Sequence, residues 1–212
     1  MVEMLHQTNP ALSIGLLGGS FNPPHVAHLA LARAARQQLQ LDRVDLLPAG
    51  QPWQKNGTPM PSAAHRLAMC GLLIEGCSNL GVEVCETQRA GNTYTVDTLR
   101  ELHTAHPQNT YVLILGADQV ARLDSWHDWQ GVLQRCTLAV AQRAGQPVVF
   151  PASVQAFLDG HCMDWHAVNL PPMRTTSTEL RRRLAAGESA GDALPPAVAR
   201  YISEHCLYLN AI

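Results

Sequence analysis

Short apolar runs alternate along the chain with longer segments in which apolar residues recur every three or four positions. The short runs predict β-strands at residues 13–17, 43–48, 81–85, 110–118, 137–142 and 166–170. The helical spacing predicts helices at residues 26–39, 63–75, 94–103, 151–158, 176–184 and 195–205. Strands that alternate with helices in this way are typical of an α/β fold built on a parallel sheet.

The same pattern predicts where two of the strands lie in that sheet. Residues 110–115 are apolar almost throughout and rich in β-branched side chains, as expected for a central strand that is buried on both faces. Residues 81–85 alternate between apolar and polar side chains, which favours a position near the edge.

A turn rich in glycine and proline joins the first strand to the first helix. It reads GGSFNPPHVAH from Gly18 to His28. Glycine lets the backbone approach a ligand closely, and the free N–H groups of a helix start favour phosphate. His25 and His28 lie three residues apart at this helix start, so both can lie on one face. The sequence therefore predicts a phosphate site here, with ordinary helix-start histidines as the alternative.

Two better-known glycine-rich phosphate loops are absent from the sequence. The Walker loop requires G-x-x-x-x-G-K-S/T, and the dinucleotide fingerprint requires G-x-G-x-x-G, and the turn matches neither. The missing fingerprint argues against a flavin- or nicotinamide-dependent oxidoreductase.

Polar residues also follow predicted strands at the carboxyl ends, where open α/β sheets bind ligands. Gly116 and Asp118 end the central strand, and a carboxylate there can accept hydrogen bonds from a ribose or cap the next helix. Lys55 lies in a loop at residues 49–61, and Arg143 follows the fifth strand. Either cation could face a substrate phosphate or carboxylate, although Lys55 could equally be a solvated loop residue.

Two further segments offer groups that could contact a ligand. Thr93 and Tyr94 begin a predicted helix, where they could bind a carboxylate or amide or simply cap the helix. Trp126 and Trp129 lie three apart on a short helical turn, so one indole can pack in the core while the other is left to stack on a ligand. Core packing of both indoles is the alternative.

A second helix start near the C-terminus carries hydroxyl groups and arginines. Thr176 and Glu179 match a capping box that opens a helix. Ser177, Thr178 and Arg181 gather at this start and predict a second anion site. The neighbouring arginines at 182 and 183 are interpreted as a solvated helix face.

Composition and charge restrict the classes of protein to which the chain can belong. The 212 residues are 46% hydrophobic and 15% charged, which fits a globular α/β protein. The net charge of −2 gives no general attraction to nucleic acid, and no apolar run is long enough to predict a membrane span. The first ten residues lack the pattern of a secretion signal, and the six cysteines form no zinc-type pair, so we expect reduced thiols and a cytoplasmic location.

Taken together, these motifs resemble the bacterial nicotinate-nucleotide adenylyltransferase family within the nucleotidyltransferase superfamily. The matching segments are residues 18–28, 48–55, 89–99, 116–118 with Trp126, and 176–181. Three departures stand out: Ala27 replaces the usual glycine between the histidines, Thr175 replaces the usual isoleucine of the last motif, and Trp53-Gln54 lies where a histidine often precedes the basic loop residue.

The resemblance implies a Rossmann-like, doubly wound parallel sheet with helices on both faces. It also implies one nucleotidyltransferase domain over residues 1–212, with a loose lead-in at 1–12 and a C-terminal helical part at 176–212. The implied reaction joins ATP and nicotinate mononucleotide into nicotinate adenine dinucleotide and pyrophosphate, with Mg²⁺ carried on ATP and no metal site of the protein's own. Nucleic-acid and membrane partners are not expected, and the oligomeric state stays open.

Residue roles follow from the same resemblance, position by position. His25 and His28 would be catalytic. The implied ATP-binding residues are Gly18, Gly19, Ser20, Phe21, His28, Gly116, Asp118, Ser177, Thr178 and Arg181. The implied residues for nicotinate mononucleotide are Lys55, Thr93, Tyr94, Trp126 and Arg143. The alternatives are an acceptor of related chemistry, namely nicotinamide mononucleotide or pantetheine phosphate, and a non-catalytic nucleotide-binding domain.

Overall fold

Six strands form one parallel sheet in a computed structural model that describes residues 10–50, 60–143, 147–171, 173 and 175–209. The strands are β1 (Ser13–Gly19), β2 (Arg43–Pro48), β3 (Leu80–Val82), β4 (Thr110–Gly116), β5 (Thr137–Arg143) and β6 (Trp165–Leu170). Their order across the sheet is β3-β2-β1-β4-β5-β6, and every neighbouring pair is parallel. This is the doubly wound arrangement that the resemblance implied.

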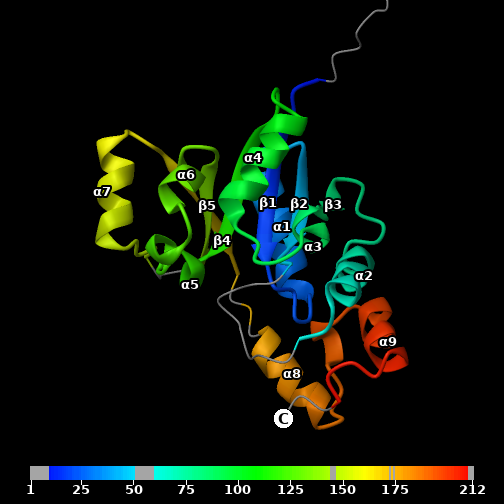
Figure 1. The fold of residues 1–212 in the computed structure, drawn as a ribbon. Coiled ribbons are helices and arrows are strands. Elements are labelled where there is room, and N and C mark those ends of the chain that lie inside the picture. The colour runs from blue at the N-terminus through cyan, green and yellow to red at the C-terminus, as the bar shows by residue number, and fades with distance from the viewer. Residues whose placement is uncertain (1–9, 51–59, 144–146, 172, 174, 210–212) are drawn as a thin grey trace, which may run out of the picture.

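Helices cover both faces of the sheet (Figure 1). They are α1 (Val26–Gln38), α2 (Ala63–Leu73), α3 (Cys85–Gln88), α4 (Thr95–Ala105), α5 (Ala117–Val120), α6 (Trp129–Leu133), α7 (Ala152–Gly160), α8 (Ser177–Ala185) and α9 (Pro196–Glu204), with short 3-10 turns at Leu123–Ser125 and Gly191–Ala193. One buried cluster joins the sheet to α1, α2, α8 and α9, and another joins it to α4, α6 and α7.

The central strand shows how one apolar run serves both clusters. Val112 and Ile114 of β4 point into the first cluster, whereas Leu113 and Leu115 point into the second. Side chains alternate across a strand, so a strand between two helical layers must be apolar on both sides. The expected central position of this strand is therefore confirmed, and β3 lies at the edge as expected.

The chain leaves β1 toward β2 and β3, and then crosses back to build β4, β5 and β6 on the other side. Connections from β1 and β4 therefore diverge at their carboxyl ends. A crevice forms at such a switch point, and ligands of doubly wound folds bind there.

The main difference from the sequence prediction concerns the segment after β3. Residues 81–85 were expected as one strand, but β3 ends at Val82 and α3 begins at Cys85. Glu83 causes the change of direction, because its Oε1 accepts hydrogen bonds from the backbone N–H groups of Val84 and Cys85 at 2.9 and 3.0 Å. Such a side chain-to-backbone turn competes with strand pairing and leaves no periodic signal.

In the part of the chain that the structure describes, no helix is both long and apolar enough to cross a membrane.

Candidate active site

A cavity of about 700 Å³ opens at the carboxyl ends of β1 and β4. Residues from distant parts of the chain line it, and most of the predicted site residues are among them. These are Gly18, Gly19, Ser20, His25, His28, Thr93, Tyr94, Gly116, Asp118, Trp126, Ser177, Thr178 and Arg181. The cavity is large enough for a dinucleotide-sized ligand, since sites for such molecules span roughly 300–1,000 Å³.

The start of α1 holds the two histidines against each other. His25 is the residue before the helix, and its backbone N–H donates to His28 Nδ1 at 3.1 Å. Their ring centroids are 3.8 Å apart. Because His28 Nδ1 accepts a hydrogen bond, the neutral ring carries its proton on Nε2, which makes Nε2 a donor.

His25 differs from His28 in its burial. Only 5% of His25 is exposed, and this burial lowers the pKa of its imidazole to about 4. His25 is therefore neutral near pH 7, and any help that it gives to a phosphate comes through a hydrogen bond rather than through a positive charge.

Acid should therefore destabilise the fold through His25. Between the unfolded pKa of about 6.5 and the folded pKa of about 4, the unfolded chain binds more protons, so stability falls as the pH falls through this window. We expect a loss of about 2 kcal/mol at pH 5 from this group. Urea unfolding at pH 7 and pH 5 measures it, and His25→Asn should lose less stability between the two pH values. An equal loss in the variant would contradict this assignment.

The start of α8 is attached directly to the turn before α1. Ser177 Oγ donates to the Pro23 carbonyl oxygen at 3.1 Å, and Arg181 Nη1 donates to the Asn22 carbonyl oxygen at 2.8 Å. Arg181 Nη2 also donates to Thr178 Oγ1 at 3.3 Å. Two helix starts that are far apart in sequence therefore open onto one cavity, and their N–H groups and the Arg181 charge favour an anion there.

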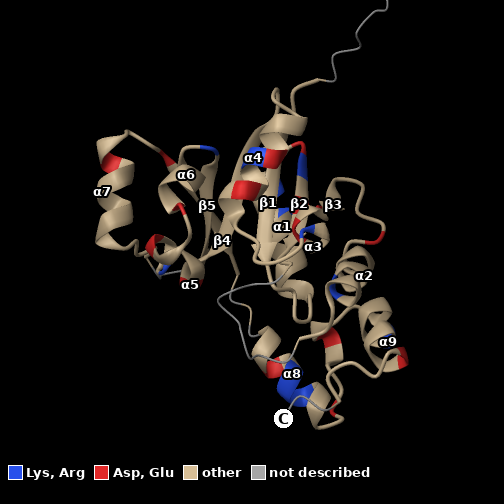
Figure 2. Ribbon diagram, viewed as in Figure 1, with Lys and Arg blue, Asp and Glu red and all other residues tan. Residues whose placement is uncertain are grey.

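The remaining polar groups of α8 follow the prediction in part, because Thr176 caps the helix but the Glu179 carboxylate pairs with Arg182 instead of completing a capping box. Thr176 caps the helix, because its Oγ1 accepts from the backbone N–H of Glu179 at 3.2 Å. Arg182 is exposed and makes two hydrogen bonds to Glu179, and Figure 2 shows the basic positions of α8 in blue. Arg182 is thus a solvated residue, as expected.

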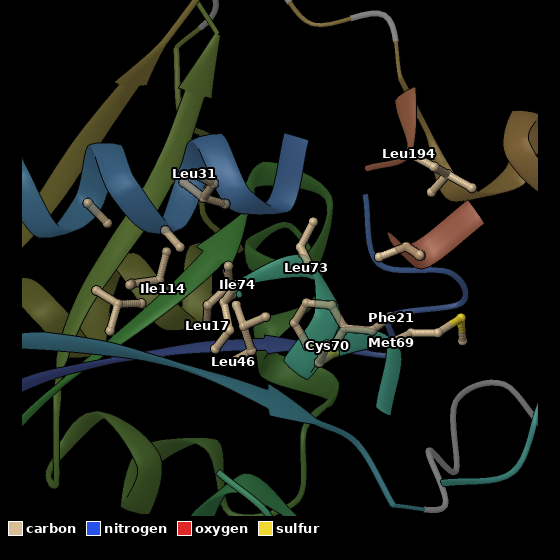
Figure 3. Packing of buried hydrophobic residues seen from close by; sticks show 14 of the residues in the cluster. Leu17, Phe21, Leu31, Leu46, Met69, Cys70, Leu73, Ile74, Ile114 and Leu194 are labelled. Carbon is tan, nitrogen blue, oxygen red and sulfur yellow. The ribbon is translucent and has the colours of Figure 1, made fainter. Parts of the chain in front are cut away.

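Phe21 is the one described residue of the predicted ATP site that does not line the cavity. Its side chain is 1% exposed and packs with Leu46, Met69 and Cys70 in the core (Figure 3). The ring lies 5.0 Å from the His28 ring, centroid to centroid. Phe21 therefore supports His28 from the core, so any contact of this residue with a nucleotide would involve the backbone of the turn rather than the ring.

Asp118 lies in the first turn of α5 and faces the cavity. The alternative that it caps the helix is wrong, because Gly116 occupies the capping position. A side chain at Gly116 would place its Cβ 2.7 Å from Asp118 Oδ1, so glycine keeps the carboxylate accessible. Gln119 Nε2 donates to the Asp118 carboxylate at 2.8 Å.

Both tryptophans pack against the cluster that joins the sheet to α4, α6 and α7, and only Trp126 also lines the cavity. Trp129 packs edge-on against Phe157 at 5.3 Å between ring centroids, in the cluster under α7. Trp126 lines the cavity, and its indole N–H is buried without a hydrogen-bond partner in the described part of the chain. A buried donor of this kind is costly unless a ligand satisfies it.

Thr93 and Tyr94 line the same cavity as Trp126. Thr93 is buried, and the Tyr94 ring lies near the His127 ring, with centroids 4.4 Å apart. Tyr94 is the residue before α4, and Thr93 makes no cap, so the capping alternative for Thr93 is wrong.

The structure does not describe the side chains of two predicted cations, Lys55 and Arg143. Residues 51–59 are not among the described residues, and this range includes Lys55 as well as Trp53 and Gln54. Arg143 ends β5, but the structure describes only its backbone.

Glu86 and Arg66 are polar residues near the cavity whose importance sequence reasoning missed. Glu86 lines the cavity from α3, a helix of four residues that is too short to show a periodicity. Arg66 lies 1% exposed on α2. The helical pattern places Arg66 on the buried face, but charge alone suggests a solvated residue.

Among the described residues, no group of three or more histidine, cysteine, aspartate or glutamate side chains could hold a metal ion.

The fold and the paired helix starts define a nucleotidyltransferase, and a family model described as cytidylyltransferase-like matches residues 16–183. A protein of Bordetella petrii is 47% identical over 197 residues, which covers 92% of this chain and 98% of that protein; its name is "Probable nicotinate-nucleotide adenylyltransferase". A protein of Chromobacterium violaceum with the same name is 40% identical over 207 residues, covering 92% and 98%. The chain belongs to the nicotinate-nucleotide adenylyltransferase family.

Solved structures agree on the fold. The Plasmodium falciparum nicotinic acid mononucleotide adenylyltransferase complexed with NaAD superposes with a TM-score of 0.74 at 19% sequence identity, over 93% of this chain and 97% of that one.

Proposed function

We propose that the starts of α1 and α8 together bind the triphosphate of ATP while its adenylyl group passes to nicotinate mononucleotide. As a member of its family, the protein makes nicotinate adenine dinucleotide and pyrophosphate in NAD biosynthesis. The observation that carries the residue assignment is the attachment of Arg181 and Ser177 to the turn that precedes the histidines.

The reaction needs positioning rather than a protein nucleophile. A phosphate oxygen of the mononucleotide attacks the α-phosphorus of ATP in line and forms the new P–O bond. The bond from the α-phosphorus to the bridging oxygen breaks, and pyrophosphate leaves with that electron pair. Charge builds up on the leaving phosphates, so fixed donors around them lower the barrier.

The described residues supply those donors. His28 Nε2 would donate to a phosphate oxygen, with neutral His25 holding its ring. Arg181, Ser177 and Thr178 would hold the β- and γ-phosphates. Gly18 and Gly19, with Ser20, let the backbone approach the nucleotide closely. Magnesium travels with ATP as part of the substrate and neutralises phosphate charge. Divalent metals generally serve nucleotidyltransferases of this kind, and Mg²⁺ is our proposal for the ion.

The other end of the cavity suits the remaining groups of the substrates. Asp118 would accept hydrogen bonds from a ribose diol beside Gly116. Thr93, Tyr94 and Trp126 would form the nicotinate pocket, and the unsatisfied indole N–H of Trp126 supports this, because a substrate oxygen can accept from it. Lys55 and Arg143 remain proposed cations for the acceptor.

We expect a preference for the acid mononucleotide over the amide. A site built to hydrogen-bond one group rejects an analogue without it, so the ratio of kcat/KM should be at least about 100-fold. The test incubates the protein with Mg-ATP and nicotinate mononucleotide, nicotinamide mononucleotide or pantetheine phosphate, and identifies each product by mass. Equal specificity constants for acid and amide would contradict the preference. Nucleotide binding without any product would favour a non-catalytic domain.

We also propose a single domain in the cytoplasm, with small-molecule partners only. Leu180 of α8 and Val198 of α9 share a buried cluster with Leu17 of β1, which supports one domain. The six cysteines are free thiols, as is usual in a reducing compartment.

A further inference from the structure

Arg66 lies behind the cavity and joins three segments of backbone. It is 1% exposed, and its guanidinium donates to the carbonyl oxygens of Ser20 at 3.1 Å, Gly50 at 2.9 Å and Pro61 at 3.3 Å. Ser20 lines the cavity in the turn after β1, whereas Gly50 follows β2. A buried guanidinium is costly to desolvate, so its hydrogen bonds must hold these segments closely.

Glu86 holds Gly50 from the opposite side. This carboxylate is 5% exposed, and Thr98 Oγ1 donates to its Oε1 at 3.0 Å. Burial raises the pKa of Glu86, while the Thr98 and Thr93 hydroxyls and the Gly50 backbone N–H act to lower it. Gly50 thus lies between a buried cation at its carbonyl and a buried carboxyl group at its amide.

The space around Gly50 shows how closely it is packed. A Cβ added there would overlap the Glu86 carbonyl oxygen and lie 2.9 Å from Thr93 Cγ2. Only glycine fits without moving α3 or the start of α4. Contacts therefore run without a break from Ser20 through Arg66 to Gly50, and from Gly50 to both Glu86 and Thr93.

We propose that Arg66 and Glu86 are positioning residues that set the two ends of the cavity relative to each other through Gly50. The inference rests on the proposed function, in which Ser20 lies on the ATP side and Thr93 on the acceptor side. Arg66 acts on both sides, because it bonds Ser20 as well as Gly50. Glu86 acts on the acceptor side, because it contacts Gly50, which lies against Thr93, and accepts a hydrogen bond from Thr98.

Two conservative substitutions separate these effects. Glu86→Gln keeps the shape but replaces one acceptor oxygen by a donor, so we expect KM for nicotinate mononucleotide to rise about tenfold with KM for ATP within about twofold. Arg66→Lys keeps the charge, but an ammonium group cannot reach three carbonyl oxygens as the planar guanidinium does. We therefore expect KM to rise for both ATP and nicotinate mononucleotide. Because both residues act through Gly50, the double variant should lose less than the product of the single effects.

Asp45→Asn is the matched control. Asp45 is a buried carboxylate of β2, 4% exposed and paired with Arg43, and it does not line the cavity. Its substitution should lower the melting temperature and leave both KM values unchanged. If Glu86→Gln behaves like this control, the positioning role is wrong. If the Arg66→Lys variant does not fold, the KM values of the Glu86→Gln variant alone test the positioning role.

The wild-type protein, assayed in parallel, separates this inference from the function on which it rests. An active wild type with unchanged KM values in the variants would overturn the positioning role alone. No dinucleotide product from the wild type would overturn the proposed function and the positioning role with it.

Discussion

His28→Ala is expected to lower kcat by about 10²- to 10³-fold, the usual cost of removing one fixed donor from a developing charge. The structure gives the reason: the backbone N–H of His25 donates to His28 Nδ1, so the neutral ring carries its proton on Nε2, and His28 lines the cavity. KM for ATP should change less than kcat, because the donor matters most as pyrophosphate leaves. Steady-state release of pyrophosphate measures both constants.

His161→Ala is the control for this variant, because His161 is exposed at the end of α7 and away from the cavity. It should retain normal turnover. The melting temperature of His28→Ala should stay close to that of the wild type. A folded His28→Ala variant with near-normal adenylyl transfer would show that His28 does not act on the phosphates.

Arg181→Ala is expected to lower kcat/KM for ATP by about 100-fold, which corresponds to about 3 kcal/mol for a charged hydrogen bond to phosphate. The loss should appear mainly in KM, since Arg181 would hold phosphates in the ground state as well as in the transition state. The substitution also removes the hydrogen bond to the Asn22 carbonyl oxygen, so the two helix starts lose one direct link.

The adjacent residue supplies the matched control. Arg182→Ala removes the same charge from the same helix, but Arg182 pairs with Glu179 on the exposed face. It should change kcat/KM by less than about twofold, because exposed ion pairs contribute little. Equal losses in the two variants would mean that α8 attracts ATP only through its general charge.

The sequence was sufficient to predict most of the sheet, because β1, β2, β4 and β5 carry buried apolar runs that are hard to mistake. It was also sufficient for both helix starts, since Thr176-x-x-Glu179 and the turn at residues 18–28 are local signals. The short helix α3 was not predictable, because a turn centred on the Glu83 side chain determines it. Periodicity carries no information about such a turn.

For the site, the sequence identified residues whose chemistry is visible in a motif. It missed Arg66 and Glu86, because their roles depend on tertiary contacts with Ser20 and Gly50. It left the direction of the Phe21 ring open for the same reason: an aromatic residue in a ligand-binding turn can face the ligand or the core, and only the packing against Met69 and Cys70 decides.

The central claim is that two distant helix starts bind one triphosphate. A crystal structure with Mg²⁺ and a non-hydrolysable ATP analogue tests it most directly. We predict that phosphate oxygens of one analogue molecule lie within hydrogen-bonding distance of both His28 Nε2 and the Arg181 guanidinium. A triphosphate that contacts only one of these two residues, or that lies outside the cavity, would contradict the account.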